Sequence, residues 1–274
     1  MAPKLRQKFV MYSCREVERT LNPRYMTPYH IQAQWAEYSK LNEIIGEVYR
    51  TRKRPLQIFD IGVGYARVPI SLSAVSTWDK IGRYVGIDVS QHCVTQSNRI
   101  ITRRKIENKT EVVKFDAVHL SSDRGESFRR NKYDLIVCTY FTAGDFKPEQ
   151  IQFETEKNGQ IVDYDINLLK PNENFVAVFK GAYDLLSDGG KIVLGSVYCD
   201  NSLARKIQEE FYRRCKMTVI TSQKDEFTAT KEGFWSERFN EGKIYEYLSW
   251  VPSDKIKLIP LDDYDFAIAI IISK

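Results

Sequence analysis

The stretch Pro55-Leu-Gln-Ile-Phe-Asp-Ile-Gly-Val-Gly64 reads as an apolar strand that ends in an acid and runs straight into a two-glycine turn. Gly62 and Gly64 lack a Cβ atom, so their backbone can take up left-handed angles and approach a ligand closely. A helix that begins after such a turn directs its free N–H groups at the same point. The stretch therefore predicts a strand, a nucleotide-binding turn and a helix.

The chemistry of this turn argues against a dinucleotide as the ligand. A dinucleotide-binding fingerprint has a third glycine at the position that Arg67 occupies here. Asp60, two residues before the first glycine, is also unfavourable for an incoming pyrophosphate. A carboxylate at this place suits a cationic ligand.

Further segments follow in the order of a βαβαβ unit. Residues 83–90 form a second predicted strand in which Asp88 stands 24 residues beyond Gly64, after a predicted helix from Ala66 to Trp78. A carboxylate at that strand end can accept hydrogen bonds from both hydroxyls of a ribose. Three later segments also read as strands, the last one after a glycine turn: residues 110–117, 133–141 and 192–197.

These five segments resemble the motifs of the class I S-adenosylmethionine-dependent methyltransferases over roughly residues 55 to 200. The resemblance implies a doubly wound, mostly parallel seven-stranded α/β sheet, with S-adenosyl-L-methionine as cofactor. It also implies that the glycine turn wraps the amino-acid end of the cofactor and that Asp88 holds the ribose. Asp116 would contact the adenine amino group while Ala117 lies against the ring. The cofactor-binding residues that the resemblance implies are Asp60, Gly62, Gly64, Asp88, Val89, Asp116, Ala117 and Thr139.

Each of these features alone has an ordinary structural explanation. A glycine pair after a strand is most often only a tight turn, and a single strand-end aspartate is most often a helix N-cap. The joint arrangement favours a cofactor site, because the ordinary explanations would require three independent coincidences along one segment.

The sequence says less about catalysis than about the cofactor. Methyl transfer from a sulfonium is an in-line displacement from an activated donor, so the protein must mainly align the acceptor and, where needed, remove a proton. The candidate catalytic residues are Tyr29 and His30, at the entrance of a helix that opens at Thr27-Pro28, and Tyr140, at the exit of the fourth strand. His30 is equally compatible with a surface position.

Additions to the core are predicted in three places. Residues 1–54 form a helical cover, and the methyltransferase domain spans residues 55–274. The cover contains an apolar stripe at helical spacing that packs on the sheet: Ile31, Trp35, Tyr38, Leu41, Ile45 and Val48. A hairpin insertion at about 146–174, centred on Asn158-Gly159, either walls the acceptor pocket or pairs across a dimer. An aromatic-rich insertion at about 224–252 is either a lid over an apolar acceptor or a satellite core.

The composition of the 274 residues, 43% of them apolar, is that of a folded globular protein. The longest apolar run, Phe266 to Ile272, has seven residues, whereas a bilayer span needs about 20, so no membrane association is expected. No secretory signal pattern follows the basic N-terminus. Five cysteines scattered singly argue against a disulfide framework and indicate a reducing, cytoplasmic compartment.

The charge distribution leaves two classes of acceptor open. Residues 1–54 carry 11 Lys or Arg against 5 Glu, whereas residues 142–174 are net acidic. A basic stripe with interleaved aromatic residues can track phosphates, but a basic surface is more often merely solvated. We therefore expect a small organic acceptor, methylated at oxygen or nitrogen. RNA or a protein is the alternative acceptor, and a non-catalytic binding protein is a third interpretation.

No metal is predicted, and some subclasses of the family are not expected. The fourth-strand exit, Cys138-Thr139-Tyr140-Phe141, lacks the prolines that enzymes methylating adenine, glutamine amides or cytosine C5 carry there. A magnesium-dependent type would place an aspartate at Thr139 and an Asp-Asn pair after the fifth strand. Asp200-Asn201 fits the pair, but the Thr139 hydroxyl is a poor ligand for a hard divalent cation.

Overall fold

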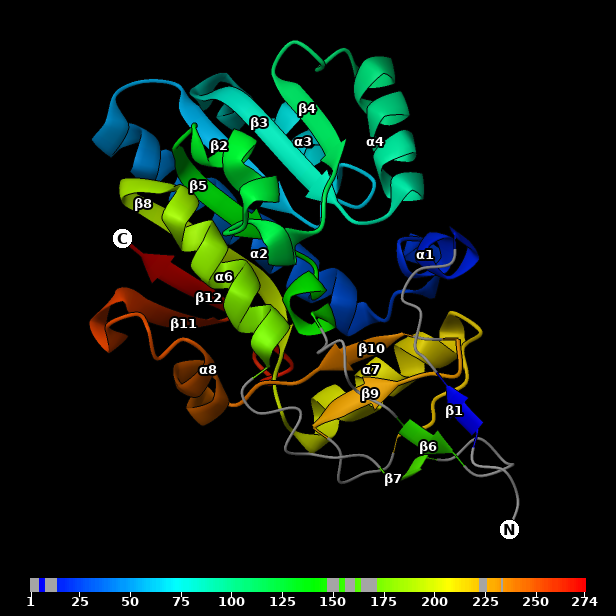
Figure 1. The fold of residues 1–274 in the computed structure, drawn as a ribbon. Coiled ribbons are helices and arrows are strands. Elements are labelled where there is room, and N and C mark those ends of the chain that lie inside the picture. The colour runs from blue at the N-terminus through cyan, green and yellow to red at the C-terminus, as the bar shows by residue number, and fades with distance from the viewer. Residues whose placement is uncertain are drawn as a thin grey trace.

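The computed structural model describes residues 5–7, 14–146, 153–155, 161–163, 172–221, 226–232 and 234–274 (Figure 1). Its central element is a seven-stranded sheet in the spatial order β11-β12-β8-β5-β2-β3-β4. These strands are β2 (Leu56–Ile61), β3 (Ile81–Asp88), β4 (Thr110–Lys114), β5 (Tyr133–Cys138), β8 (Leu186–Tyr198), β11 (Ile256–Pro260) and β12 (Ala267–Ser273).

Strand β12 alone runs against the others, because it pairs antiparallel with both β8 and β11 while the remaining neighbours pair in parallel. The predicted doubly wound, mostly parallel seven-stranded sheet is thereby confirmed. The glycine turn expected before the fifth strand lies inside β8: Gly189 has φ +69°, and the pairing with β5 shifts register there.

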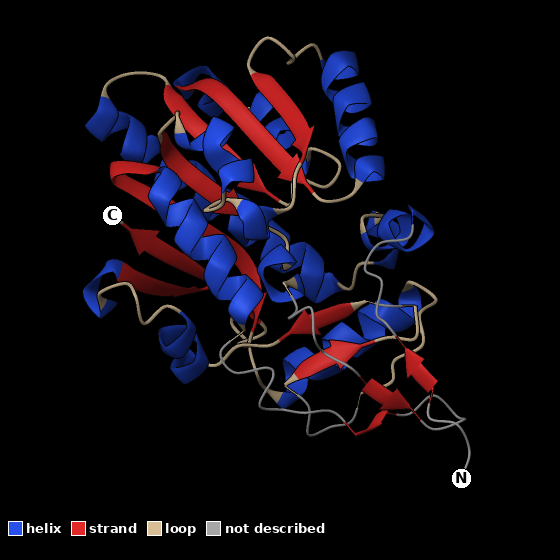
Figure 2. Cartoon of the chain, in the orientation of Figure 1, coloured by secondary structure: helices blue, strands red, loops and turns tan. Residues whose placement is uncertain are grey.

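Helices cover both faces of the sheet (Figure 2). They are α1 (Cys14–Thr20), α2 (Pro28–Arg52), α3 (Arg67–Ser73), α4 (Gln91–Arg104), α5 (Glu126–Arg129), α6 (Glu173–Leu185), α7 (Ser202–Arg214) and α8 (Glu241–Tyr247). Within the described part of the chain, no helix is both long and apolar enough to cross a membrane.

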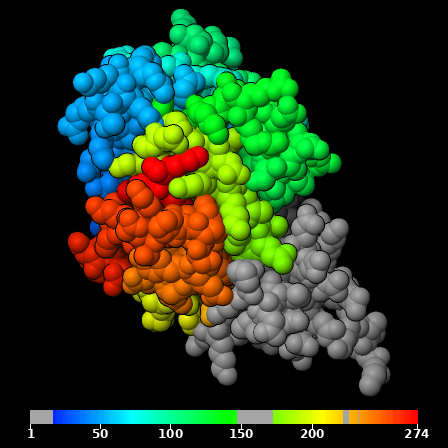
Figure 3. All heavy atoms as spheres, turned by 60° about the vertical axis from the view of Figure 1, so that its left-hand side comes forward, coloured from blue at the N-terminus to red at the C-terminus, as the bar shows by residue number. Residues whose placement is uncertain are grey.

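Alternation along the strands explains the two layers of core. In β2, Phe59 and Ile61 belong to the cluster that packs against α6 and α8, whereas Ile58 belongs to the cluster formed with α2 and α3. Successive side chains of a strand point to opposite faces, so an unbroken apolar strand is buried on both. The C-terminal elements pack beside α6 on one side of the molecule (Figure 3).

Helix α2 opens where the sequence predicts it. Thr27 is the N-cap and accepts a hydrogen bond from the His30 backbone N–H, and Pro28 holds the first helical position. The predicted apolar stripe is only partly right. Leu41, Ile45 and Val48 are buried, but Ile31 and Trp35 are 41% and 71% exposed. The buried face of the first turns is rotated away from Ile31 and Trp35, and its side chains are His30, Ala33 and Glu37.

The basic run at the end of α2 has a structural role. Arg52 Nε and Arg54 Nη2 lie 3.0 and 2.9 Å from Oδ1 of Asp134, a fully buried carboxylate at the start of β5. Both cations therefore neutralise a group at the amino edge of the parallel strands.

The two predicted insertions form small sheets next to the large one. β6 (Phe153–Thr155) pairs antiparallel with β7 (Ile161–Asp163), in keeping with a hairpin, and β1 (Leu5–Gln7) pairs with the other edge of β6. The turn at Asn158-Gly159 lies outside the described residues. Strands β9 (Phe227–Ala229) and β10 (Trp235–Glu237) pair with each other.

The aromatic insertion is largely buried. Phe227, Trp235, Phe239 and Tyr247 are at most 1% exposed, and Arg238 lies among them with bonds to Gln208 and Thr228. Successive side chains at β10 point to opposite sides. Phe234 and Ser236 face a cavity, whereas Trp235 points away from it and packs against Phe227, with ring centroids 5.6 Å apart. The segment is thus a packed core whose inner edge walls the cavity.

Candidate functional site

The glycine turn after β2 is held in left-handed backbone conformations. Gly62 has φ +74° and Gly64 has φ +55°, angles that cost other residues energy. A Cβ atom on Gly62 would overlap the methyl group of Thr142, so only glycine fits there. The Gly64 N–H donates to Asp88 Oδ2 at 2.9 Å, which ties the turn to the end of β3.

Asp88 is anchored by backbone groups on both oxygens. Besides the bond from Gly64, its Oδ1 accepts from the Ser90 N–H at 2.8 Å. Burial raises the pKa of Asp88, while the two backbone N–H bonds oppose that rise. Each carboxylate oxygen has two lone pairs, so Asp88 can still accept hydrogen bonds from a ligand.

The adenine-side pair predicted from the sequence lies at the end of β4. Asp116 Oδ1 accepts from the Val118 N–H at 3.2 Å as the N-cap of a short 3-10 turn, and Ala117 is buried beside it. A cap needs only part of the carboxylate, so its remaining lone pairs are open to a ligand.

These groups share one cavity of about 810 Å³ at the carboxyl ends of the parallel strands. Gly62, Gly64, Asp88, Val89, Asp116, Ala117 and Tyr140 of the predicted residues line it. Ligands of doubly wound sheets bind at this edge, and the volume suits a nucleoside-sized molecule together with a second small one.

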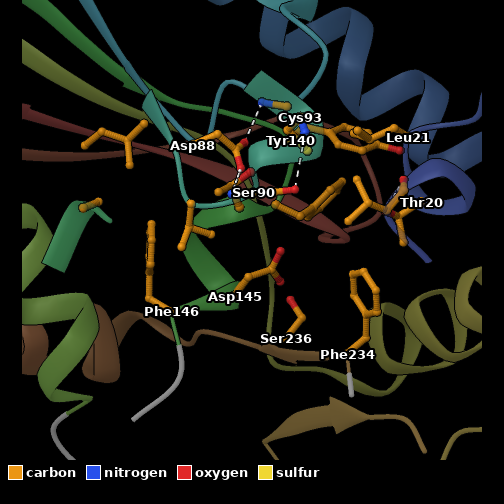
Figure 4. A pocket seen from close by; sticks show the side chains of 18 of the residues that line it. Thr20, Leu21, Asp88, Ser90, Cys93, Tyr140, Asp145, Phe146, Phe234 and Ser236 are labelled. Carbon is orange, nitrogen blue, oxygen red and sulfur yellow. Dashed lines mark hydrogen bonds between the residues drawn. The ribbon is translucent and has the colours of Figure 1, made fainter. Parts of the chain in front are cut away.

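The far end of the cavity is aromatic and comes from several elements. Its lining residues are Phe141, Asp145, Phe146, Tyr198, Phe211, Tyr212, Phe234 and Ser236. Asp88 lies on one side, and Asp145, Ser236 and Phe234 lie on the other (Figure 4). The cavity thus has one end lined by the glycine turn, Asp88 and Asp116, and a separate aromatic end.

The turn that joins the two ends is strained. Tyr140 and Phe141 have φ 56° and 61°, in a region that costs a non-glycine residue about 1 to 2 kcal/mol. The Tyr140 N–H donates to Glu37 Oε2 at 2.9 Å, and the Phe141 ring stacks on Tyr198 at 3.9 Å between centroids. These contacts hold the turn, and such strain is often found at functional sites.

Asp60 and Thr139 do not line the cavity. Asp60 is 1% exposed and accepts a hydrogen bond from the Tyr84 hydroxyl at 2.6 Å. Burial raises its pKa to about 7, and the Tyr84 bond opposes this. The Thr139 hydroxyl accepts from Arg67 Nη2 at 3.2 Å, and Thr139 lines a second, smaller cavity on the other side of the glycine turn. Their roles in cofactor binding stay predictions.

Tyr29 and His30 lie behind the aromatic wall. Tyr29 packs against Tyr264 and Phe266. His30 is fully buried, so a surface position is wrong for it, and its ring nitrogens bond the hydroxyls of Thr27 at 2.7 Å and Tyr198 at 2.8 Å. Burial, with a smaller effect of Arg214, lowers its pKa to about 3. Of the three catalytic candidates, Tyr140 alone reaches the cavity.

We expect His30 to remain neutral at physiological pH and to make folding sensitive to acid. The unfolded chain binds a proton at the ordinary histidine pKa of about 6.5, while the native state does not bind it until about pH 3. Stability should fall by up to about 1.4 kcal/mol per pH unit as the pH drops below 6.5. Urea unfolding of His30→Asn at several pH values should show a flatter acid limb. An unchanged slope would mean that His30 is charged in the native protein.

No group of three or more His, Cys, Asp or Glu that could hold a metal occurs among the described residues. The Asp-Asn pair after the fifth strand is used structurally. Asp200 Oδ1 lies 3.4 Å from Arg238 Nε, and Asn201 caps α7 by accepting from the Ala204 N–H.

The residues that sequence reasoning missed are those of the aromatic end that lie outside the insertion at about 224–252. Asp145 follows the fourth strand within seven residues, and that strand exit was already a candidate region, so the exit was a usable signal. Tyr198, Phe211 and Tyr212 come from β8 and α7, and no local pattern distinguishes them from core.

No protein-family description and no curated protein sequence matches this chain. Its fold matches that of an S-adenosylmethionine-dependent methyltransferase from Clostridium acetobutylicum, at 12% identity over 86% of this chain and 91% of that one, with a TM-score of 0.52. It also matches magnesium protoporphyrin IX methyltransferase from Synechocystis with bound SAH, at 11% identity over 94% and 93% of the two chains, again with a TM-score of 0.52. At such identities the shared property is the fold.

Proposed function

We propose that this protein, whose fold is that of the class I S-adenosylmethionine-dependent methyltransferases, transfers a methyl group from S-adenosylmethionine to oxygen or nitrogen of a small organic acceptor. One observation carries the proposal: the glycine turn, Asp88 and Asp116 all face a single cavity that continues into an aromatic end. The bound SAH in a solved protein of the same fold supports the choice of cofactor.

In the proposed complex the adenine lies beside Asp116 and Ala117, and the ribose hydroxyls donate to Asp88. The methionine portion passes over Gly62 and Gly64 towards Tyr140. The sulfonium then faces the aromatic end, where the acceptor binds. The cavity aligns the two reactants beside each other, which is most of what transfer from an activated donor requires.

RNA is the less favoured acceptor on two structural grounds. None of the described residues that line the cavity is Lys or Arg, whereas phosphate contacts need such cations. Arg52 and Arg54 of the basic N-terminal region bind Asp134 at the opposite edge of the sheet. A dimer through the hairpin insertion remains a prediction. So does a cytoplasmic location, which the free cysteines Cys93, Cys138, Cys199 and Cys215 support.

Two binding measurements test the function and the acceptor class. Calorimetry should show S-adenosylmethionine binding in preference to NAD or ATP, and radiolabel from the methyl group should enter a pool of small metabolites. RNA should bind weakly. Preference for NAD or ATP would overturn the proposal, and tight RNA binding whose log affinity falls with log salt by several units would make RNA the acceptor.

A further inference from the structure

Among the described residues, Asp145 is the carboxyl group that lines the aromatic end of the cavity. Asp145 ends the 3-10 turn at Thr142–Asp145 and lies on the wall of the cavity near Phe146, Phe234 and Ser236 (Figure 4). Gly144 sets this position, because a Cβ atom there would come within 2.8 Å of Ser236 Oγ and 2.9 Å of the Glu237 carbonyl oxygen. The turn is thus packed tightly against β10.

Asp145 has no cation to balance it among the residues that the structure describes. No ion pair joins it to any of them, and the neighbouring Ser236 is buried and neutral. Asp145 itself is half-buried on the cavity wall, so its carboxylate is open to a ligand that brings its own hydrogen-bond donor. Burial raises the pKa of Asp145 to about 8, although the Ser236 hydroxyl favours the carboxylate.

The titratable groups that face Asp145 are acids. Tyr198 of β8, Tyr212 of α7 and Cys138 of β5 each have a pKa raised, first by burial and further by the charge of Asp145. All three stay neutral when Asp145 ionises. Arg238, which also acts on Tyr212, is bound to Asp200 and Gln208.

We propose that the acceptor is an arylalkylamine, whose ammonium group is held by the Asp145 carboxylate in the part of the cavity that Phe141, Phe211 and Phe234 line. This inference rests on the proposed methyltransferase function. Rings attract cations through their faces, and a carboxylate inside an aromatic enclosure selects a positive group. A carboxylate or phosphate acceptor would instead place an anion beside Asp145, with none of the described lining residues to neutralise it.

Asp145 also supplies the base that this chemistry needs. The bound ammonium first gives one proton to the Asp145 carboxylate, which becomes a neutral carboxylic acid. The freed nitrogen lone pair attacks the methyl carbon of the sulfonium. As the new N–C bond forms, the C–S bond breaks, and its electron pair stays on sulfur as a neutral thioether. The product is a methylated ammonium, and Asp145 then releases its proton to solvent. A base whose pKa is near the working pH suits such a transfer.

A set of three probes that share the phenylethyl group and differ in the charge of their end group tests the acceptor class. We would saturate the protein with S-adenosylhomocysteine and titrate it with 2-phenylethylamine, 2-phenylethanol and 3-phenylpropionate by calorimetry. The amine should bind at least tenfold more tightly than the alcohol, and the propionate should not bind. Asp145→Asn should lose at least tenfold in affinity for the amine and change alcohol binding less than threefold. Asp254→Asn, at an exposed aspartate outside the cavity lining, is the matched control and should change neither.

The wild-type protein gives a second, independent readout. Between about pH 6 and 8, amine affinity should rise about tenfold per unit, because Asp145 must ionise to bind the ammonium. The proton that it releases makes the measured enthalpy depend on the buffer. Equal affinity for amine and alcohol, tighter binding of the alcohol or the propionate, or amine affinity independent of pH, would overturn the inference. Failure of S-adenosylhomocysteine to bind would instead overturn the proposed function itself, so the two failures are distinguishable.

Discussion

Trp235→Ala should lower the free energy of unfolding by about 3 to 5 kcal/mol, the cost of deleting a large buried aromatic side chain. Trp235 is 0% exposed, and its ring packs near Phe227 without lining the cavity. The affinity for S-adenosylmethionine should therefore stay unchanged in the folded fraction. Urea unfolding and calorimetry on the same preparation measure both quantities.

Two neighbouring changes serve as controls for Trp235. Trp235→Phe should cost clearly less than the alanine change, because it keeps most of the ring and removes an indole N–H that has no hydrogen-bond partner among the described residues. Phe234→Ala alters the cavity-facing side of the same segment and should weaken binding of the acceptor more than binding of the cofactor. If Trp235→Ala leaves stability intact but changes acceptor kinetics, the segment is a movable lid.

Asp88→Ala should weaken S-adenosylmethionine binding by about 1.5 to 3 kcal/mol, or roughly tenfold to 150-fold in Kd, the value of hydrogen bonds to a charged group. The carboxylate lies on the cavity wall and keeps lone pairs beyond those that Gly64 and Ser90 use. Calorimetry with S-adenosylmethionine measures the loss, and a thermal melt shows whether the variant is folded.

A ligand change separates direct contact with the ribose from a general loosening of the glycine turn. The wild-type protein should bind the 2′-deoxy analogue of S-adenosylhomocysteine less tightly than the parent, whereas Asp88→Ala should bind the two almost equally. If the loss of affinity from the 2′-deoxy change and the loss from Asp88→Ala simply add, Asp88 supports the turn without touching the ribose.

The sequence predicts the sheet and the cofactor side of the cavity because both follow from local order. A βαβ unit places consecutive strand ends at one edge, so Asp88 and Asp116 must lie near Gly62 once the strands pair in parallel. The same reasoning places Tyr140 at that edge. Nothing beyond chain order and the period of the strands is needed for these residues.

Position at a strand end does not fix the direction in which a side chain points. Asp60 is turned towards Tyr84 in the core, away from the cavity. Periodicity also does not fix which face of a helix is buried when apolar residues flank that face, so Trp35 is predicted as core and is exposed, while Ala33 and Glu37 are buried. Asp145, from the turn after β5, and Phe211, from α7, line one cavity through tertiary packing that no local pattern specifies.

The carboxyl groups of the cavity also bear on how the protein would distinguish fresh from spent cofactor. S-adenosylmethionine carries a sulfonium charge that S-adenosylhomocysteine lacks. The described lining residues include the carboxyl groups of Asp88 and Asp116 and no Lys or Arg, so the charged donor is attracted more strongly than its neutral thioether product. Loss of the methyl group removes that attraction at the moment of reaction. The same arrangement would thus limit product inhibition, and ionic strength should alter it little because half-buried charges are screened less than exposed ones.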